Sequence, residues 1–286
     1  MAPGRLAMRV VRTTGAADAG DSGGPVSPAA LRTLITAPFL DRAAEQLLMD
    51  AVDVVGHAST TTAYAIGFNA EMAMVSRLSR LTGRPVAATC ASAVRALRVL
   101  QVERMALIGA PWFAPEFNEL GAAYFANQGF DVVSSASANL SQDPRAIEPA
   151  AVCEWASRYA AAAAQAIFIG GNGFRAAGAI EALETAIGRP VLTSNQVLLW
   201  QLLAEADDTF EINGYGQLFA HKTLSRQSLH GEVKRGFTNQ PEWARRRNIH
   251  RRLGDGSEHR LRGAYLRLGS ASAAGSCPRE LIPSLR

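Results

Sequence analysis

Short polar segments stand directly after apolar stretches at several places in the chain, and their groups could bind a small anion. Ser59-Thr60-Thr61-Thr62 places four hydroxyl groups in a row. Gly171-Asn172-Gly173 combines an amide side chain with two glycines, and Thr193-Ser194-Asn195-Gln196 adds further hydroxyls and amides. Hydroxyls, amides and free backbone N–H groups at helix starts can form a pocket for a carboxylate. The alternative interpretation is that these residues only cap their helices.

The elements that would position these segments alternate regularly. Short apolar runs, several ending in Gly, are typical of buried parallel strands; they span 52–58, 85–88, 105–109, 130–133, 166–170 and 190–193. Helical patterns lie between and after them, at 71–81, 91–102, 115–128, 150–164, 175–187 and 197–206. This alternation predicts parallel βαβ units. In such sheets ligands bind beyond the carboxyl ends of the strands, which is where the polar segments lie.

Two parts of the chain repeat one pattern. Gly83-Arg84-Pro85-Val86 and Gly188-Arg189-Pro190-Val191 lie 105 positions apart, and each is typical of a helix end followed by a strand. Upstream of the first pattern Ser59 follows a predicted strand, and upstream of the second Gly171 does the same; the two residues are 112 positions apart. The repeat predicts a duplicated α/β fold whose two pseudo-symmetric halves have mainly parallel sheets flanked by helices, with an active-site cleft between them. Alternatively, Gly-Arg-Pro-Val is only a common way to leave a helix and begin a strand.

Composition excludes several classes of protein. The 286 residues are 48% hydrophobic and 19% charged, which indicates a folded chain with a sizeable core. No apolar run reaches the ~18 residues of a membrane helix, and no secretory signal follows the first arginines. We therefore expect no membrane partner and a cytoplasmic location. The three cysteines, Cys90, Cys153 and Cys277, are too few and too scattered for a disulfide framework or a zinc site.

Positive charge is concentrated at the end of the chain. Residues 1–220 hold 15 Arg and no Lys against 20 acidic residues, whereas residues 221–286 have a balance of +9. Because apolar periodicity is weak there, we expect residues 220–286 to form a disordered or poorly packed basic tail. Nucleic-acid binding through this tail is the hypothesis that we rank last, since the tail has few aromatic residues and no recognisable motif. Residues 1–26 are expected to be loop-like.

The polar segments and their surroundings resemble a known superfamily. Residues 52–67, VDVVGHASTTTAYAIG, look like the first active-site motif of maleate cis-trans isomerases and arylmalonate decarboxylases, which belong to the aspartate/glutamate racemase superfamily. Residues 166–184 resemble the second motif, and 188–196 and 214–219 look like the segments that close the domain. The resemblance covers about residues 27–219 and implies two pseudo-symmetric α/β halves. It also implies an N-terminal strand that we find no equivalent for, so we expect the first strand to be missing.

The resemblance implies cofactor-free chemistry on a small carboxylate or dicarboxylate. The first expectation is a maleate isomerase-like reaction, and the second is that of a racemase or decarboxylase. In the superfamily, one or two cysteines act as nucleophile or proton donor, because a thiol pKa lies near working pH. Ser59 and Gly171 stand at these two positions here. A serine needs an adjacent base, and His57 is the candidate because residues two apart on a strand face the same side; a structural histidine is the alternative.

The remaining candidates would bind the substrate; they are Thr60, Thr61, Trp112, Gly171, Asn172, Gly173 and Asn195. Trp112 falls about where the isomerases place a substrate-contacting tyrosine, and its alternative role is to form a hydrophobic wall. Cys90 is a further thiol to test, because it stands at a predicted helix start where the helix dipole would lower its pKa. The competing hypothesis is an inactive relative that binds carboxylates without proton transfer. Assembly into a homo-oligomer stays open.

Overall fold

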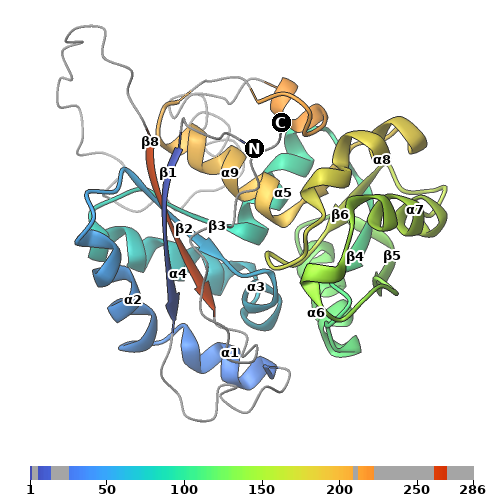
Figure 1. The fold of residues 1–286 in the computed structure, drawn as a ribbon. Coiled ribbons are helices and arrows are strands. Elements are labelled where there is room, and N and C mark those ends of the chain that lie inside the picture. Colours follow the sequence, from blue (N-terminus) through green and yellow to red (C-terminus); the bar gives the residue numbers. More distant parts are fainter. Residues whose placement is uncertain (2–5, 14–25, 209–211, 222–260, 269–286) are drawn as a thin grey trace, which may run out of the picture.

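A computed structural model describes residues 1, 6–13, 26–208, 212–221 and 261–268. Two four-stranded sheets, each parallel throughout, lie on either side of a central pair of helices (Figure 1). The strand order is β1-β8-β2-β3 in the first sheet and β5-β4-β6-β7 in the second. The strands are β1 Leu6–Thr13, β2 Val54–Ala58, β3 Val86–Ala88, β4 Arg104–Gly109, β5 Asp131–Ser137, β6 Ala166–Ile169, β7 Val191–Thr193 and β8 Leu261–Leu268.

Helices follow most strands and cover the sheets. They are α1 Pro28–Leu34, α2 Phe39–Leu48, α3 Thr60–Ile66, α4 Phe68–Thr82, α5 Thr89–Val99, α6 Pro115–Ala126, α7 Pro149–Tyr159, α8 Ile180–Ile187 and α9 Ser194–Glu205. Within the described residues, none of these helices combines the length and apolar character needed to cross a membrane.

The alternating pattern predicted from the sequence is confirmed, since each of the six predicted strands forms as one of β2 to β7. The helix predicted over 150–164 ends earlier, at Tyr159, and the one predicted over 175–187 becomes α-helical only at Ile180. In α4, apolar side chains lie on the exposed side as well as on the buried side. Met72 and Leu81 are 39% and 36% exposed, whereas the buried side includes Glu71.

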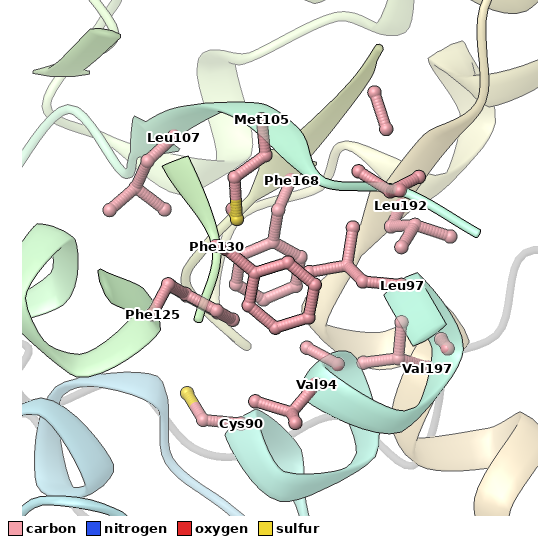
Figure 2. Packing of buried hydrophobic residues seen from close by; sticks show 14 of the residues in the cluster. Cys90, Val94, Leu97, Met105, Leu107, Phe125, Phe130, Phe168, Leu192 and Val197 are labelled. Atoms are coloured by element: carbon pink, nitrogen blue, oxygen red, sulfur yellow. The ribbon is translucent and has the colours of Figure 1, made fainter. Parts of the chain in front are cut away.

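The central helices α5 and α9 join the two sheets into one structure. Figure 2 shows Val94 and Leu97 of α5 and Val197 of α9 packed with Phe168 and Leu192 of the second sheet. Each such side chain contributes ~1.5–3 kcal/mol when it leaves water. The two halves of the molecule are therefore held together by a shared apolar core.

The first sheet is reached by the other side of α9. Leu198 and Leu202 of α9 pack there against Val54, Ala58 and Ala87. Val54 and Ala58 lie on one face of β2, and Val55 on its opposite face belongs to the cluster beneath α2 and α4. β2 is therefore buried on both faces, which explains the absence of charged side chains along it.

The duplication predicted from the sequence is visible in the sheets. β2 and β3 are neighbours in one half, as β6 and β7 are in the other. The helix that precedes β3 and the helix that precedes β7 each end at a left-handed glycine, Gly83 with φ +64° and Gly188 with φ +65°. The equivalence extends to the remaining strands. β8 takes the place in the first sheet that β4 takes in the second, and β1 takes the place of β5.

Both ends of the chain differ from expectation where the structure describes them. Leu6–Thr13, expected to be part of a loop, forms β1, and Leu261–Leu268, expected to be part of a disordered or poorly packed tail, forms β8 between β1 and β2. Strands of this kind are missed because each pairs with segments far away in the chain. The rest of the tail expectation lies outside the described residues, and the boundaries of the 27–219 domain remain predictions.

Candidate functional site

Four polar segments meet at the junction of the two halves: the three described from the sequence and a fourth that begins at Thr89. They follow β2, β3, β6 and β7, whose carboxyl ends point to this junction. Their side chains form a hydrogen-bonded group that we call the hydroxyl–amide cluster; its members are Thr60, Thr89, Asn172, Ser194 and Asn195.

Thr60 is the centre of the hydroxyl–amide cluster. Its Oγ1 accepts a hydrogen bond from the backbone N–H of Gly171 at 3.0 Å. The same oxygen lies 3.1 Å from Asn172 Oδ1, to which it donates, and 3.0 Å from Ser194 Oγ. Ser59, the residue before Thr60, and Gly171 therefore belong to neighbouring segments, even though they are 112 positions apart in the chain.

The contacts of the cluster repeat the symmetry of the fold. Thr60 and Asn172 are equivalent residues of the two halves, 112 positions apart, and they contact each other directly. Thr89 and Ser194 are equivalent at a spacing of 105. Thr60 contacts Ser194, and Asn172 in turn accepts from Thr89 at 3.3 Å. The cluster is thus built on the pseudo-twofold relation between the halves, with each half contributing the same two positions.

Asn172 and Asn195 are paired through both of their amide groups. Asn172 Nδ2 donates to Asn195 Oδ1 at 3.1 Å, and Asn195 Nδ2 donates to the backbone carbonyl of Asn172 at 3.1 Å. Thr89 Oγ1 also lies 3.2 Å from the carbonyl oxygen of His57, at the end of β2. These bonds tie the Gly171-Asn172-Gly173 segment to the starts of α5 and α9.

Ser59 acts locally as the N-cap of α3. Its Oγ accepts from the backbone N–H of Thr62 at 3.3 Å and lies 2.7 Å from Thr62 Oγ1. Ser59 is buried, whereas Thr61 in the first turn of α3 is half-buried. The capping interpretation of the serine is therefore confirmed. Its hydroxyl can also serve a ligand, since Thr62 can be the donor in the bond between the two hydroxyls.

His57 is buried near the end of β2 and forms no hydrogen bond with Ser59. Its side chain is 1% exposed, and neither ring nitrogen has a hydrogen-bond partner within the described residues. Burial lowers the pKa of His57 to about 4, so the imidazole is neutral at physiological pH. The structure shows no hydrogen bond that would let His57 activate Ser59, whose oxygen is bonded to Thr62 instead.

Gly171 has a backbone that only glycine adopts readily. Its φ is +107°, and a Cβ added there would lie 2.8 Å from Ala110 Cβ, closer than real Cβ contacts. A side chain at this position would be strained for both reasons. Within the described part of the chain Gly173 makes no hydrogen bond, and it is half-buried. Gly171 and Gly173 therefore offer a ligand no side chain, and the N–H of Gly171 is already bonded to Thr60.

Trp112 takes the hydrophobic role that the sequence left as its alternative. It follows β4, is half-buried and packs edge-on against Phe174, with ring centroids 6.0 Å apart. Both belong to the apolar cluster on the side of β6 that faces α7 and α8. Phe174 directly follows Gly173, so the two rings buttress the segment that carries Asn172.

The sequence interpretation missed a buried polar group behind the site. Glu71 of α4 is 0% exposed, and its Oε2 accepts a hydrogen bond from the hydroxyl of Tyr124 on α6. Cys90 also lies here, and its Sγ faces the carbonyl oxygen of Thr60 at 3.7 Å. One signal could have revealed the group: Glu71 occupies the same helical face as Met74, Val75 and Leu78.

Burial controls the titration of this group. It raises the pKa of Glu71 to about 7, against the lowering effects of the Tyr124 hydroxyl and the Ala91 and Cys90 amides. It also raises the pKa of the Cys90 thiol well above its usual value, and the Glu71 charge adds to this. The expectation that the helix dipole lowers the pKa of Cys90 is therefore wrong, because desolvation outweighs the dipole.

Other features of the described residues do not extend the site. An open hollow of about 520 Å³ lies on α7, around Trp155 and Tyr159, and contains none of the predicted residues. Among the residues that the structure describes, no three His, Cys, Asp or Glu side chains come together in a way that could hold a metal ion.

Comparisons with known proteins give one family match and a shared fold. A sequence model described as arylmalonate decarboxylase matches residues 36–219. A comparison with curated proteins finds no match. Among solved structures, a glycine-to-cysteine mutant of arylmalonate decarboxylase in its sulfate-associated form has a TM-score of 0.63 at 22% identity, and the alignment covers 75% of this chain and 98% of that one.

Maleate isomerases have a similar fold. The maleate isomerase Iso from Pseudomonas putida S16, as a cysteine-to-alanine variant with maleate, has a TM-score of 0.62 at 21% identity, over 70% of this chain and 82% of that one. A cysteine-to-serine mutant of Nocardia farcinica maleate cis-trans isomerase with a covalently bound succinylcysteine intermediate has a TM-score of 0.60 at 19% identity, covering 74% and 83%. At these identities the likeness shows the fold alone.

Proposed function

Since the chain belongs to the arylmalonate decarboxylase family, we propose that the junction of its two halves binds a small carboxylate or dicarboxylate and carries out isomerase- or decarboxylase-type chemistry without a cofactor. The observation that carries this proposal is the contact of Thr60 with Gly171, Asn172 and Ser194, which brings both halves to one point. Ser59 and Thr61 on one side and the backbone of Gly173 on the other supply the donors that a carboxylate requires.

Decarboxylation suits these donors better than cis–trans isomerisation. In a malonate, the bond between the α-carbon and the departing carboxylate breaks, CO₂ leaves, and the electron pair moves into an enediolate on the retained carboxylate. A proton from solvent or a hydroxyl then returns to the α-carbon. Hydrogen-bond donors aimed at the enediolate stabilise this charge, each by about 3–4 kcal/mol in other enzymes. Nucleophilic addition to a double bond would need an activated side chain, which neither Ser59 nor Gly171 is seen to provide.

The second candidate function is carboxylate binding without turnover. It is favoured by one observation, that the His57 ring makes no hydrogen bond within the described residues while Ser59 caps its own helix. Proton transfer then has no base in direct contact with the serine. The two candidates share the binding site and differ only in whether product forms.

Turnover and binding assays distinguish the two candidates. We would incubate the protein with phenylmalonate, malonate, maleate and aspartate, follow each by NMR, and measure binding by calorimetry. Thr60→Val should abolish binding by removing the central hydroxyl, whereas Thr185→Ala, an exposed position on α8, is the matched control. CO₂ release that is lost in Ser59→Ala supports catalysis; saturable binding without product supports the second candidate. If the protein neither binds nor converts any acid of the panel, the proposal is refuted.

A further inference from the structure

One aromatic side chain of the first half reaches into the second half next to the hydroxyl–amide cluster. Tyr64 lies one turn after Thr60 on α3 and is 4% exposed. α3 packs against α6 of the second half (Figure 1). There the Tyr64 ring belongs to the same apolar cluster as Tyr124 and Phe125 of α6, with ring centroids 6.0 Å and 6.3 Å away. Tyr64 therefore connects the helix that begins at the site with the core of the other half.

Two glycines of the second half leave room for the Tyr64 side chain. At Gly121, in the interior of α6, an added Cβ would lie 2.8 Å from Cε2 and 2.9 Å from Cζ of Tyr64. At Gly170, directly after β6, an added Cβ would lie 3.1 Å from the Tyr64 hydroxyl oxygen. Glycine inside a helix costs about 0.5–1 kcal/mol relative to alanine, so its presence in α6 requires an explanation. The close approach of the Tyr64 ring provides one.

Thr60 contacts the same glycine as Tyr64. A Cβ at Gly170 would lie 3.2 Å from Cγ2, the methyl carbon of Thr60. Because residues four apart on a helix share a face, the two side chains of α3 lie together against Gly170. The next residue, Gly171, donates its backbone N–H to Thr60 Oγ1 at 3.0 Å. The fit of Tyr64 between α6 and the end of β6 therefore determines how closely Thr60 approaches Gly171.

This fit depends on the ring of Tyr64 and has no counterpart in the second half. The Tyr64 hydroxyl is buried without a hydrogen-bond partner among the described residues, so it adds no net stabilisation. At a spacing of 112, the residue equivalent to Tyr64 is Ala176, and the residue equivalent to Gly170 is Ala58. The contact is thus made once, by the first half upon the second.

We propose that Tyr64 is a positioning residue, a spacer between α6 and the end of β6 that sets the contact of Thr60 Oγ1 with the Gly171 amide. Tyr64 touches no substrate in this proposal and acts through Thr60. Its importance for carboxylate binding rests on the proposed function, whereas its effect on the contact between Thr60 and Gly171 does not. Gly121 and Gly170 are the positions that admit the spacer.

Hydrogen exchange of the Gly171 amide, followed by NMR on the full chain, measures this contact without a ligand. Tyr64→Leu removes the ring and should raise the exchange rate at least about fivefold. Tyr64→Phe keeps the ring and should stay within about twofold of the unmodified protein. Phe130→Leu is the matched control, because it truncates a buried ring of the same cluster that packs on Phe125 instead, and it should leave Gly171 unchanged.

The two glycines separate the hydroxyl of Tyr64 from its ring. Gly170→Ala should raise the exchange of Gly171, and adding Tyr64→Phe should reverse part of the rise, because it removes the oxygen that the new Cβ meets. Gly121→Ala should raise the exchange as well, but Tyr64→Phe should not reverse it, because there the new Cβ meets ring carbons that phenylalanine keeps. These variants also carry the test if Tyr64→Leu does not fold.

Three results would overturn the proposal. They are unchanged exchange of Gly171 in Tyr64→Leu, an equal rise in Phe130→Leu, and no reversal of the Gly170→Ala effect by Tyr64→Phe.

Calorimetry with malonate is a separate readout of the same variants. Tyr64→Leu should bind about tenfold more weakly, with Tyr64→Phe and Phe130→Leu unchanged, because one donor or acceptor of the cluster is displaced. Full affinity in Tyr64→Leu would count against the positioning role. If the unmodified protein binds no malonate, the proposed function fails, and the exchange result alone decides the role of Tyr64.

Discussion

The two halves of the molecule reach the same architecture by different routes. The second half takes its four strands from one continuous stretch, β4 to β7, whereas the first half combines β2 and β3 with β1 and β8 from near the two ends of the chain. The helices that start at the site also differ, since α9 is capped by its own Thr193, whereas α5 has no side-chain cap. The second half thus depends on local sequence, and the first on long-range contacts.

This difference indicates which half of the site is more sensitive to substitutions elsewhere in the chain. The polar segments of both halves contribute equally to the hydroxyl–amide cluster, through Thr60 and Thr89 on one side and Asn172 and Ser194 on the other. A change far from the cluster should therefore disturb the first half more readily than the second. The predictions below test that asymmetry.

The largest expected effect concerns the central strands of the two sheets. Ala264 of β8 and Ala106 of β4 lie at the equivalent strand positions. Proline at either one removes a backbone N–H from an interior strand, which we expect to cost about 3 kcal/mol or more. Hydrogen exchange should show Ala264→Pro loosening β1 and β2 only, and Ala106→Pro loosening β5 and β6 only. Unchanged exchange of β2 in Ala264→Pro would contradict the placement of β8.

The buried carboxyl of the first half should make the protein less stable as pH rises. Because the pKa of Glu71 is raised to about 7 in the folded state, its stabilising contribution is present below the unfolded value of 4.5 and is lost as pH rises through 7. Over this pH range the wild type should lose about 3 kcal/mol of folding free energy through Glu71, and the Glu71→Gln variant should not show this loss. Urea unfolding at pH 5 and pH 8 measures it.

The groups around Glu71 do not cancel this dependence. Tyr124, Tyr64 and Cys90 face it from α6, α3 and α5, and each has a raised pKa, so all three stay protonated across the range. A wild-type protein whose stability relative to Glu71→Gln is the same at both pH values would show that Glu71 is not buried as described.

The buried imidazole should have the opposite pH dependence. The pKa of His57 is lowered to about 4, so its contribution is present above the unfolded value of 6.5 and is lost as pH falls toward 4. His57→Ile introduces the residue type that Ile169 supplies at the equivalent position of the second half. We expect the variant to gain about 3 kcal/mol relative to the wild type between pH 6.5 and pH 4. Equal acid unfolding of both proteins would refute this.

The smallest expected effect compares the two positions where the superfamily places cysteine. Gly171→Cys should cost about 2 kcal/mol, because φ is +107° and the new Cβ would meet Ala110. Ser59→Cys has an extended backbone and should lose only part of a helix cap, about 1 kcal/mol. Thermal unfolding of both variants gives the order, and Gly67→Ala, where φ is +78° but no atom lies near, separates backbone strain from crowding.

Much of the site follows from the sequence. The segments after the predicted strands are the ones that meet, and Thr60, Asn172 and Asn195 are joined there by hydrogen bonds. Parallel strands place their carboxyl ends at one edge, so residues that follow them are brought together by topology alone. The role of His57 beside Ser59 could not be derived in the same way, because a shared strand face does not decide which atoms come within bonding distance.

By itself the sequence determined the order of strands and helices, the duplication and the absence of a thiol at Ser59 and Gly171, because each is written in local pattern or residue type. Only the tertiary structure decided that β8 completes the first sheet, that Glu71 is buried against the Tyr124 hydroxyl, and that His57 is buried without a hydrogen-bond partner among the described residues. Periodicity shows which face of an element is apolar, but the segment that covers that face is chosen by packing among parts of the chain that lie far apart.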